Sequence, residues 1–373
     1  GEEILELQAH GGRIILDLLL ARALELGARV ARPGEFLERA FLNEKIDLLQ
    51  AEAVSDLIEA TTVRAARSAR NSMQGAFSIR INELVEELIE LRAYIEAAID
   101  FSEEEIEFLS DGIVSKRLAE LEQKVHQVLS TARQGCLLRE GMTLVIAGKP
   151  NSGKSSLLNA LAKKDTAIVT SQPGTTRDVL RETITIDGMP VHVIDTAGLR
   201  HSEDPVEREG IRRAHLEIQQ ADRILWMIDV SDPERNRADD PFFSNEIKIT
   251  RISNKIDLTG ELPEITSSGQ GTEIFLSVKT GAGMDLLYQH LKASIGYDDQ
   301  IEDVFIARRR HIDALNAATA LIRSAMIQLT EYHRPELVAE ELRLTQRSLA
   351  EITGEFTTDD LLGRIFSSFC VGK

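Results

Sequence analysis

Apolar side chains recur three and four residues apart over residues 81–98, 118–128 and 312–329. The positions are Ile81, Leu84, Leu88, Leu91, Ile95 and Ala98; then Leu118, Leu121, Val125 and Val128; then Ile312, Leu315, Ile322, Met326 and Leu329. This spacing lines up side chains along one face of an α-helix, and such a stripe most often packs into a core. We therefore predict that residues 1 to about 140, and those beyond 303, are mostly helical.

The pattern changes between residues 143 and 296. Short runs of β-branched and aliphatic residues, at 143–147, 191–194, 224–228 and 247–252, alternate with helical stretches. This alternation predicts a parallel sheet covered by helices on both faces. We therefore expect a multi-domain α and α/β fold, in which an α/β domain (141–297) is inserted into a discontinuous helical domain (44–140 and 298–373).

The composition is that of an ordinary globular protein, because 43% of the 373 residues are hydrophobic and 28% are charged. No apolar run approaches the roughly 18 residues that span a bilayer. Gly1 is not followed by a secretory signal, and the only cysteines, Cys136 and Cys370, form neither a disulfide framework nor a metal motif. We expect a cytoplasmic protein without a membrane span, and a fragment or trimmed chain, since it does not begin with Met.

The net charge of −18 argues against coating nucleic acid through bulk charge. The charge is uneven, because residues 81–107 hold ten acids against Arg92 alone, whereas residues 61–80 hold four arginines and no acid. The arginines are Arg64, Arg67, Arg70 and Arg80. Two interpretations stay open: solvated helix faces, or a basic strip that contacts phosphates beside an acidic face that contacts a partner.

A phosphate-binding loop, GxxxxGK[ST], occupies residues 148–155. It follows a predicted strand and opens a predicted helix, which is the context that makes the motif credible. Backbone N–H groups of such a loop, and the helix N-terminus, attract phosphate. Lys154 would reach the β- and γ-oxygens, and the Ser155 hydroxyl would bind magnesium.

Three further motifs follow in the order expected of a GTP-binding domain. Asp195-Thr196-Ala197-Gly198 closes a predicted strand, and Thr175-Thr176 precedes it in a loop where a hydroxyl can complete the metal site. Asn254-Lys255-Ile256-Asp257 follows another strand, and Asp257 can accept both guanine N–H donors, which adenine lacks. Ser277-Val278-Lys279 stands where a guanine-supporting loop is expected.

The residue after this DxxG motif is Leu199, where many GTPases carry a Gln that orients water. Leucine cannot orient water, so the domain needs another group or is slow. Glu207 is the candidate, directly or through a second water; alternatively it is a surface acid at a helix start. The amide oxygen of Asn151 can bind a monovalent cation near the β–γ bridge, where a cation replaces an arginine finger.

These residues resemble a known family. The inserted domain, Asn151, the sequence Thr-Ser-Gln-Pro-Gly-Thr-Thr-Arg-Asp at 170–178, Leu199, and the C-terminal Phe-Cys-Val-Gly-Lys at 369–373 are similar to the MnmE (TrmE) family of tRNA-modification GTPases. His-Gly-Gly at 10–12 and Ala-Arg-Pro-Gly-Glu-Phe at 31–36 extend the resemblance over essentially the whole chain.

The resemblance implies a potassium-activated GTPase whose G domains close face to face in a homodimer. Its potassium ligands would be Asn151, Thr170, Gln172 and Thr175. Ser155 and Thr176 would hold magnesium, and Glu207 would orient the water. With the motifs, it predicts GTP contacts at Asn151, Ser152, Gly153, Lys154, Ser155, Ser156, Thr170, Ser171, Gln172, Pro173, Gly174, Thr175, Thr176, Asp195, Thr196, Ala197, Gly198, Asn254, Lys255, Asp257, Ser277, Val278 and Lys279.

The resemblance further implies that residues 1–43 are the remnant of an N-terminal α+β domain that dimerises and binds a tetrahydrofolate one-carbon donor (5,10-methylene- or 5-formyl-). With a flavin-dependent subunit of the MnmG (GidA) type, the family builds an aminomethyl-type group (carboxymethylaminomethyl) on the wobble uridine of certain tRNAs. Glu6, Lys45 and Lys373 match its folate site, and Cys370 is a candidate for the chemistry. The family's first strands precede the position of Gly1, so we expect an incomplete folate site and an impaired dimer.

Two alternatives stay open. One is a ribosome-assembly GTPase that binds structured RNA without modifying it, and the other is a switch that only recruits effectors. The first class usually carries a basic module after the G domain, and here Arg308-Arg309-Arg310 is the only dense basic cluster in that part. The Cys-x-Gly-Lys end favours the modification GTPase through the resemblance.

Overall fold

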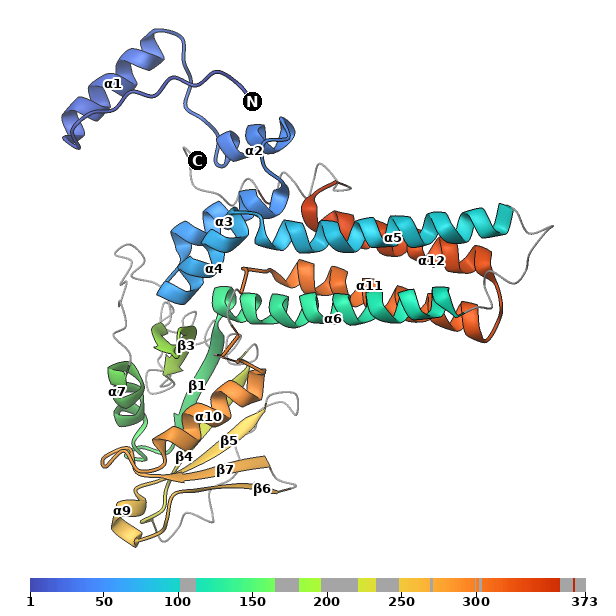
Figure 1. Cartoon of the computed structure of the whole chain (residues 1–373). Coiled ribbons are helices and arrows are strands. Elements are labelled where there is room, and N and C mark those ends of the chain that lie inside the picture. Colours follow the sequence, from blue (N-terminus) through green and yellow to red (C-terminus); the bar gives the residue numbers. More distant parts are fainter. Residues whose placement is uncertain are drawn as a thin grey trace, which may run out of the picture. The chain divides into compact units, whose positions relative to one another are not determined.

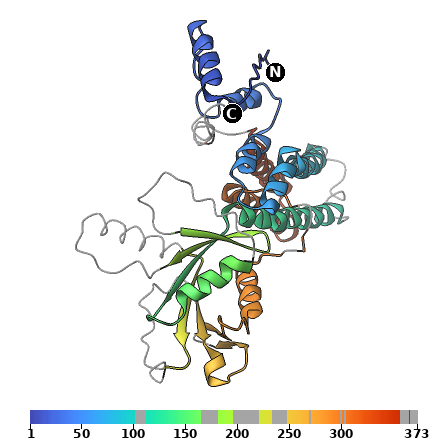
Figure 2. The same ribbon diagram turned by 90° about the vertical axis from the view of Figure 1, so that its left-hand side faces the viewer.

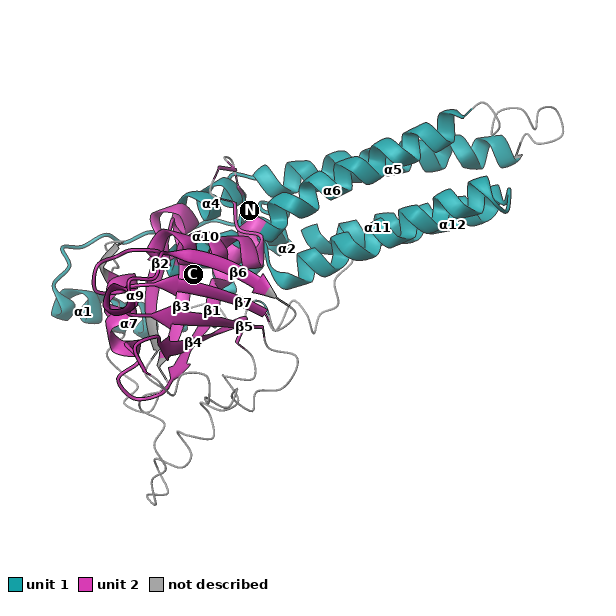
Figure 3. Ribbon diagram, turned by 90° about the horizontal axis from the view of Figure 1, so that it is seen from below, with its two compact units in different colours: residues 1–59, 67–133, 305–373 teal, residues 60–66, 134–304 magenta. Residues whose placement is uncertain are grey.

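The computed structural model describes residues 1–100, 112–164, 181–195, 221–232, 248–268, 271–298, 300–301, 304–355 and 365. They form two compact units (Figure 3): unit 1 comprises residues 1–59, 67–133 and 305–373, and unit 2 comprises 60–66 and 134–304. The α/β segment is therefore inserted into a helical unit built from both ends of the chain, which confirms the predicted fold class. The predicted domain boundaries after residues 43, 140 and 297 stay predictions.

Unit 1 is helical (Figure 1). Its helices are α1 (Arg13–Glu25), α2 (Glu35–Leu42), α3 (Leu48–Glu59), α4 (Val63–Met73, whose first turn belongs to unit 2), α5 (Ala76–Asp100), α6 (Ile113–Glu140, which ends in unit 2), α11 (Arg309–Thr330) and α12 (Pro335–Thr353). No helix in the described ranges combines the length and the apolar character that a bilayer crossing requires.

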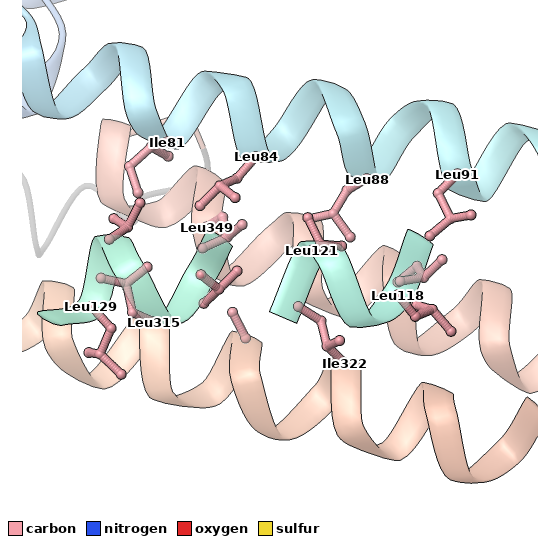
Figure 4. Packing of buried hydrophobic residues seen from close by; sticks show 14 of the residues in the cluster. Ile81, Leu84, Leu88, Leu91, Leu118, Leu121, Leu129, Leu315, Ile322 and Leu349 are labelled. Atoms are coloured by element: carbon pink, nitrogen blue, oxygen red, sulfur yellow. The ribbon is translucent and has the colours of Figure 1, made fainter. Parts of the chain in front are cut away.

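Four long helices, α5, α6, α11 and α12, contribute to one hydrophobic core (Figure 4). Leu88 of α5, Leu121 of α6 and Ile322 of α11 point into the space between the helices and are at most 2% exposed. Burying each such side chain contributes about 1.5–3 kcal/mol. The predicted helical stripes are thus confirmed as core, with Ile312 and Met326 packed against it as partly buried side chains, whereas the half-buried Ala98 is not part of the cluster.

A cluster of buried charges joins α3 to the start of α11. Glu52 and Asp56 of α3 are 2% and 6% exposed. Arg310 contacts Glu52 at 2.8 Å, and Arg308 contacts Asp56 at 3.0 Å. His311, 2% exposed, has Nε2 3.2 Å from Glu52 Oε2. Two cations of the basic cluster at 308–310 therefore face buried acids within unit 1, which removes them as an RNA-binding patch.

Part of the acidic stretch lies on α5, whereas its acids Glu103, Glu104, Glu105 and Glu107 lie outside the described residues. Four of its exposed or half-buried glutamates pair with cations of α5 or α6. The pairs are Arg80–Glu83, Arg92–Glu96, Arg117–Glu90 and Lys124–Glu87. These four pairs are consistent with solvated helix faces for the part of the stretch that lies on α5.

Unit 2 contains a seven-stranded sheet in the order β2-β3-β1-β4-β5-β7-β6. The strands are β1 (Met142–Gly148), β2 (Arg181–Ile186), β3 (Met189–Asp195), β4 (Arg223–Asp229), β5 (Ile249–Asn254), β6 (Glu264–Ser268) and β7 (Gly271–Leu276). The five inner strands are parallel, as predicted. The edge strands β2 and β6 are antiparallel to their neighbours, which the sequence interpretation did not foresee.

The parallel strands direct their carboxyl ends to one edge of the sheet, which is where ligands bind in open α/β folds. Helix α7 (Lys154–Lys164) follows β1 there and packs against β1, β2 and β3 (Figure 2). The short α9 (Ile256–Thr259) follows β5, and α10 (Met284–Ile295) packs against β7. This arrangement brings the ends of β1, β4, β5 and β7 to the same side.

Residues 60–66 join unit 2 although they are distant in sequence from the rest of it. Thr62 Oγ1 donates to the carbonyl of Gly188, at the β2–β3 turn, over 2.9 Å. The Arg64 guanidinium lies 5.4 Å from the ring centroid of Tyr297, just beyond α10. We call residues 60–66 the clip, because they bind both the hairpin turn and the end of the last helix of the unit.

Candidate functional site

The phosphate-binding loop connects β1 to α7 in the predicted strand–loop–helix context. Gly148, Asn151 and Gly153 have positive φ angles of 147°, 64° and 103°. Such left-handed residues are how a loop gathers backbone N–H groups around an anion. A Cβ on Gly153 would lie 2.3 Å from Asn254 Nδ2, so only glycine fits this close approach.

Lys154 is the first residue of α7, and its side chain lies over the loop. Its Nζ donates to the carbonyls of Gly148 and Lys149 at 2.9 and 2.8 Å. The ammonium group is therefore held at the mouth of the loop, beside the positive end of the helix dipole. Ser155, in the first turn, is exposed, and its hydroxyl is available for a hard cation.

Asn254, the last residue of β5, braces the two halves of the site. Its Nδ2 donates to the carbonyl of Ser152 at 2.9 Å, and its Oδ1 accepts from the Val278 N–H at 3.1 Å. The side chain is 3% exposed. It therefore ties the phosphate-binding loop to the loop after β7, a bracing role that the sequence motif alone did not reveal.

Asp257 and Ser277 meet at the same end of the sheet. Ser277 Oγ donates to Asp257 Oδ1 at 2.6 Å, and Ser277 is fully buried. This hydrogen bond orients the exposed Asp257 carboxylate, an acceptor for paired N–H donors. The structure therefore brings together the two motifs predicted to select guanine.

One pocket of about 580 Å³ contains residues of all three described motifs. Its lining residues are Gly153, Ser156, Asn159, Ala160, Asn254, Lys255, Asp257, Leu258, Ser277, Val278 and Lys279. This volume is typical of small-molecule sites, which span roughly 300–1,000 Å³. The residues of the two guanine motifs line this pocket together with Gly153 of the phosphate-binding loop, whereas Lys154 and Ser155 do not line it.

Several predicted site residues lie outside the described residues, so the structure does not place them. They are Thr170, Ser171, Gln172, Pro173, Gly174, Thr175, Thr176, Thr196, Ala197, Gly198, Leu199, Glu207, Cys370 and Lys373. Of Asp195 the structure describes the backbone, which closes β3 opposite Ile146 of β1. Of the predicted potassium ligands the structure describes Asn151, and of the predicted magnesium ligands it describes Ser155. Both roles stay predictions.

The two described residues of the predicted folate site are Glu6 and Lys45, and both are exposed. Lys45 lines a second pocket of about 570 Å³ with residues of α2, α3, α5 and α12, namely Phe41, Gln50, Asn82 and Thr353 among others. Glu6 does not line this pocket. The described part of the chain thus provides a cavity beside Lys45, and the folate role of both residues stays a prediction.

Comparison with known proteins assigns the family. A family model described as the MnmE helical domain matches residues 48–370, and one described as the GTP-binding protein TrmE N-terminus matches residues 1–45. The tRNA modification GTPase MnmE of Proteus mirabilis (strain HI4320) is 58% identical over 380 aligned positions, which cover 100% of this chain and 84% of that protein. The chain belongs to the MnmE family. The family resemblance inferred from the motifs is thereby confirmed.

A second relative carries the same name, and a solved structure matches part of the chain. The MnmE protein of Haemophilus influenzae (strain PittEE) is 56% identical, again over 100% of this chain and 84% of that protein. Among solved structures, the G domain of the T. maritima FeoB iron transporter is 26% identical, covers 42% of this chain and 96% of that chain, and has a TM-score of 0.29. The curated relatives are named tRNA modification GTPases, so the MnmE family is one of GTP hydrolases.

Proposed function

We propose that the chain binds GTP in the 580 Å³ pocket and hydrolyses it to GDP and phosphate. This hydrolysis would be a step in tRNA modification. The observation that carries this proposal is the pocket itself, which joins the phosphate-binding loop to the Asn254–Asp257 motif. Lys154 neutralises charge on the β- and γ-phosphates, and Asp257 accepts the guanine N–H donors. Asn254 holds the two halves at a fixed separation.

The residues present fit the two cations that this reaction needs. Ser155 offers an exposed hydroxyl in the first turn of α7, and with Thr176 it would hold magnesium, which neutralises phosphate charge when bound. Asn151 offers an amide oxygen from an exposed left-handed position in the loop. With Thr170, Gln172 and Thr175 it would hold potassium, an oxygen-seeking cation that does the work of an arginine finger.

Hydrolysis then depends on a water-orienting group other than the usual Gln, because Leu199 occupies that position. We assign the role to Glu207. Glu207→Ala should reduce the rate of GTP hydrolysis and leave GTP affinity nearly unchanged, since the residue acts on water. Potassium should accelerate hydrolysis well beyond sodium. Equal rates in the two salts would remove the cation role of Asn151, and a collapse in affinity would make Glu207 structural.

The finer proposal concerns the tRNA product. We propose that the chain acts in the cytoplasm as a homodimer, with a flavin-dependent subunit of the MnmG type and a tetrahydrofolate one-carbon donor. Together they would place an aminomethyl-type group on the wobble uridine of certain tRNAs. Lys45, Glu6 and Lys373 would bind the folate, and Cys370 is a candidate for the chemistry. The 56–58% identical relatives are named tRNA modification GTPases, which supports the tRNA part of this proposal.

The decisive experiment analyses tRNA from cells that lack this protein. Mass spectrometry of the wobble uridine should show loss of the modified nucleoside, and supplying the protein should restore it. Supplying Lys154→Ala should not restore it, because GTP binding is lost. An unchanged modification of the wobble uridine in the deficient cells would refute the tRNA proposal. It would not contradict the proposal that the chain hydrolyses GTP.

A further inference from the structure

Asp229 belongs to none of the sequence motifs, yet it lies beside the proposed nucleotide pocket. It is the last residue of β4, and the register of the sheet places it opposite Asn254 of β5. The main chains are joined here, because the Val230 N–H donates to the Asn254 carbonyl at 3.0 Å. Asp229 is therefore fixed one strand away from the guanine motif.

Both carboxylate oxygens of Asp229 are used. Oδ2 accepts a hydrogen bond from the Lys255 ammonium group. Oδ1 accepts from the Ser231 N–H at 3.0 Å and from the Ser231 hydroxyl at 2.6 Å. Partial burial acts to raise the pKa of Asp229, but the hydrogen bonds from Lys255 and Ser231 lower it overall, so the carboxylate stays charged.

Lys255 combines a constrained backbone with a position in the pocket wall. It precedes α9 in a left-handed conformation, with φ at 72°, which is strained for a residue with a Cβ. It lines the pocket between Asn254 and Asp257. A lysine side chain that lines a pocket loses much rotamer freedom when a ligand binds, unless its head group is already held.

We propose that Asp229 is a positioning residue for the guanine nucleotide, which acts by anchoring Lys255 before the nucleotide arrives. The inference rests on the GTP binding proposed above and extends it to a residue that does not line the pocket. Asp229 prearranges the pocket wall that receives the nucleotide. It takes no part in hydrolysis, so it affects GTP and GDP alike.

The test compares Asp229→Ala and Asp229→Asn with Glu264→Ala, an exposed carboxylate on β6 that does not line this pocket. Equilibrium titration with a fluorescent GDP analogue, and competition with GTP, measures affinity. Both Asp229 variants should weaken GTP and GDP binding by up to about tenfold, the usual cost of immobilising one rotamer-rich side chain on binding. The rate at saturating GTP should not change, and Glu264→Ala should match the parent protein.

A double-mutant cycle with Lys255→Ala separates positioning from general destabilisation. If Asp229 acts through Lys255, Asp229→Ala should add little to the affinity loss of Lys255→Ala. Additive losses, unchanged affinity in Asp229→Ala, or a fall in the saturated rate would each overturn the proposal. Failure of the parent protein to bind GTP would instead refute the proposed function. Fluorescence of Trp226, on the same strand, checks that the variants fold.

Discussion

Protonation of His311 should destabilise unit 1 as the pH falls. The imidazole is fully enclosed, and burial, followed by the charge of Arg310, lowers its pKa from the usual 6.5 to about 4, despite the opposing contact with Glu52. The geometry explains the direction. His311 Nδ1 accepts the backbone N–H of Arg308 at 3.1 Å, so a second proton would have to displace that hydrogen bond.

The size of the effect follows from the difference between the two pKa values. Because the folded pKa lies below the unfolded one, the unfolded chain takes up the proton first. The stabilisation is complete above pH 6.5 and declines as the pH falls toward 4. At 1.36 kcal/mol per pKa unit, this residue should account for a loss of about 3 kcal/mol over that interval.

Urea unfolding followed by far-UV circular dichroism measures this loss, because unit 1 is helical. Fluorescence of Trp226, the single tryptophan, follows unit 2 separately. His311→Gln should show a shallower fall of the unfolding free energy with acid than the parent chain, whatever its stability at neutral pH. Equal pH dependence in His311→Gln and the parent would refute the reasoning.

Three other substitutions test the packing. Gly153→Ala should abolish GTP binding measured by calorimetry without unfolding the chain, because its Cβ would collide with the Asn254 amide. Leu88→Ala should lower the unfolding free energy seen by circular dichroism by about 2–5 kcal/mol, since the side chain is 1% exposed in the four-helix core. Arg64→Ala should lower the unfolding free energy reported by Trp226 by about 1–2 kcal/mol. The clip then loses the hydrogen bond from the Arg64 guanidinium to the Ile301 carbonyl and the cation–π contact with Tyr297. No change in the respective readout would contradict each prediction.

Features with a repeating pattern were predictable from the sequence. The stripe that includes Leu84 and Leu88 predicted both the helix and its buried face. Apolar residues with a period of 3.6 indicate a helix, and they also mark the side of the helix that is buried. The parallel strands were predictable in the same way, from short aliphatic runs. The hairpin between β2 and β3 was missed, although Asp187-Gly188, with φ angles of 49° and 87°, is the dipeptide that two-residue turns favour.

Contacts between distant residues were not predictable from one sequence. The pairing of Lys255 with Asp229 depends on the β4–β5 register, which places residues 26 positions apart side by side. Glu52 lies on an otherwise ordinary helix, and its partner Arg310 comes 258 residues later. A charge pattern alone suggests that such groups are exposed to solvent. A buried charge is strongly destabilising unless it is paired, and the linear sequence does not identify the partner.

The discontinuity of unit 1 has a consequence during synthesis. Helices α5 and α6 leave the ribosome before α11 and α12, which complete their core, and residues 141–308 are made in between. At ribosomal speeds of 5–20 residues per second, that interval lasts roughly ten to thirty seconds. During it the leucine stripes of α5 and α6 lack the part of their core that α11 and α12 supply. The nascent chain should therefore expose part of these apolar helix faces until α12 has been translated.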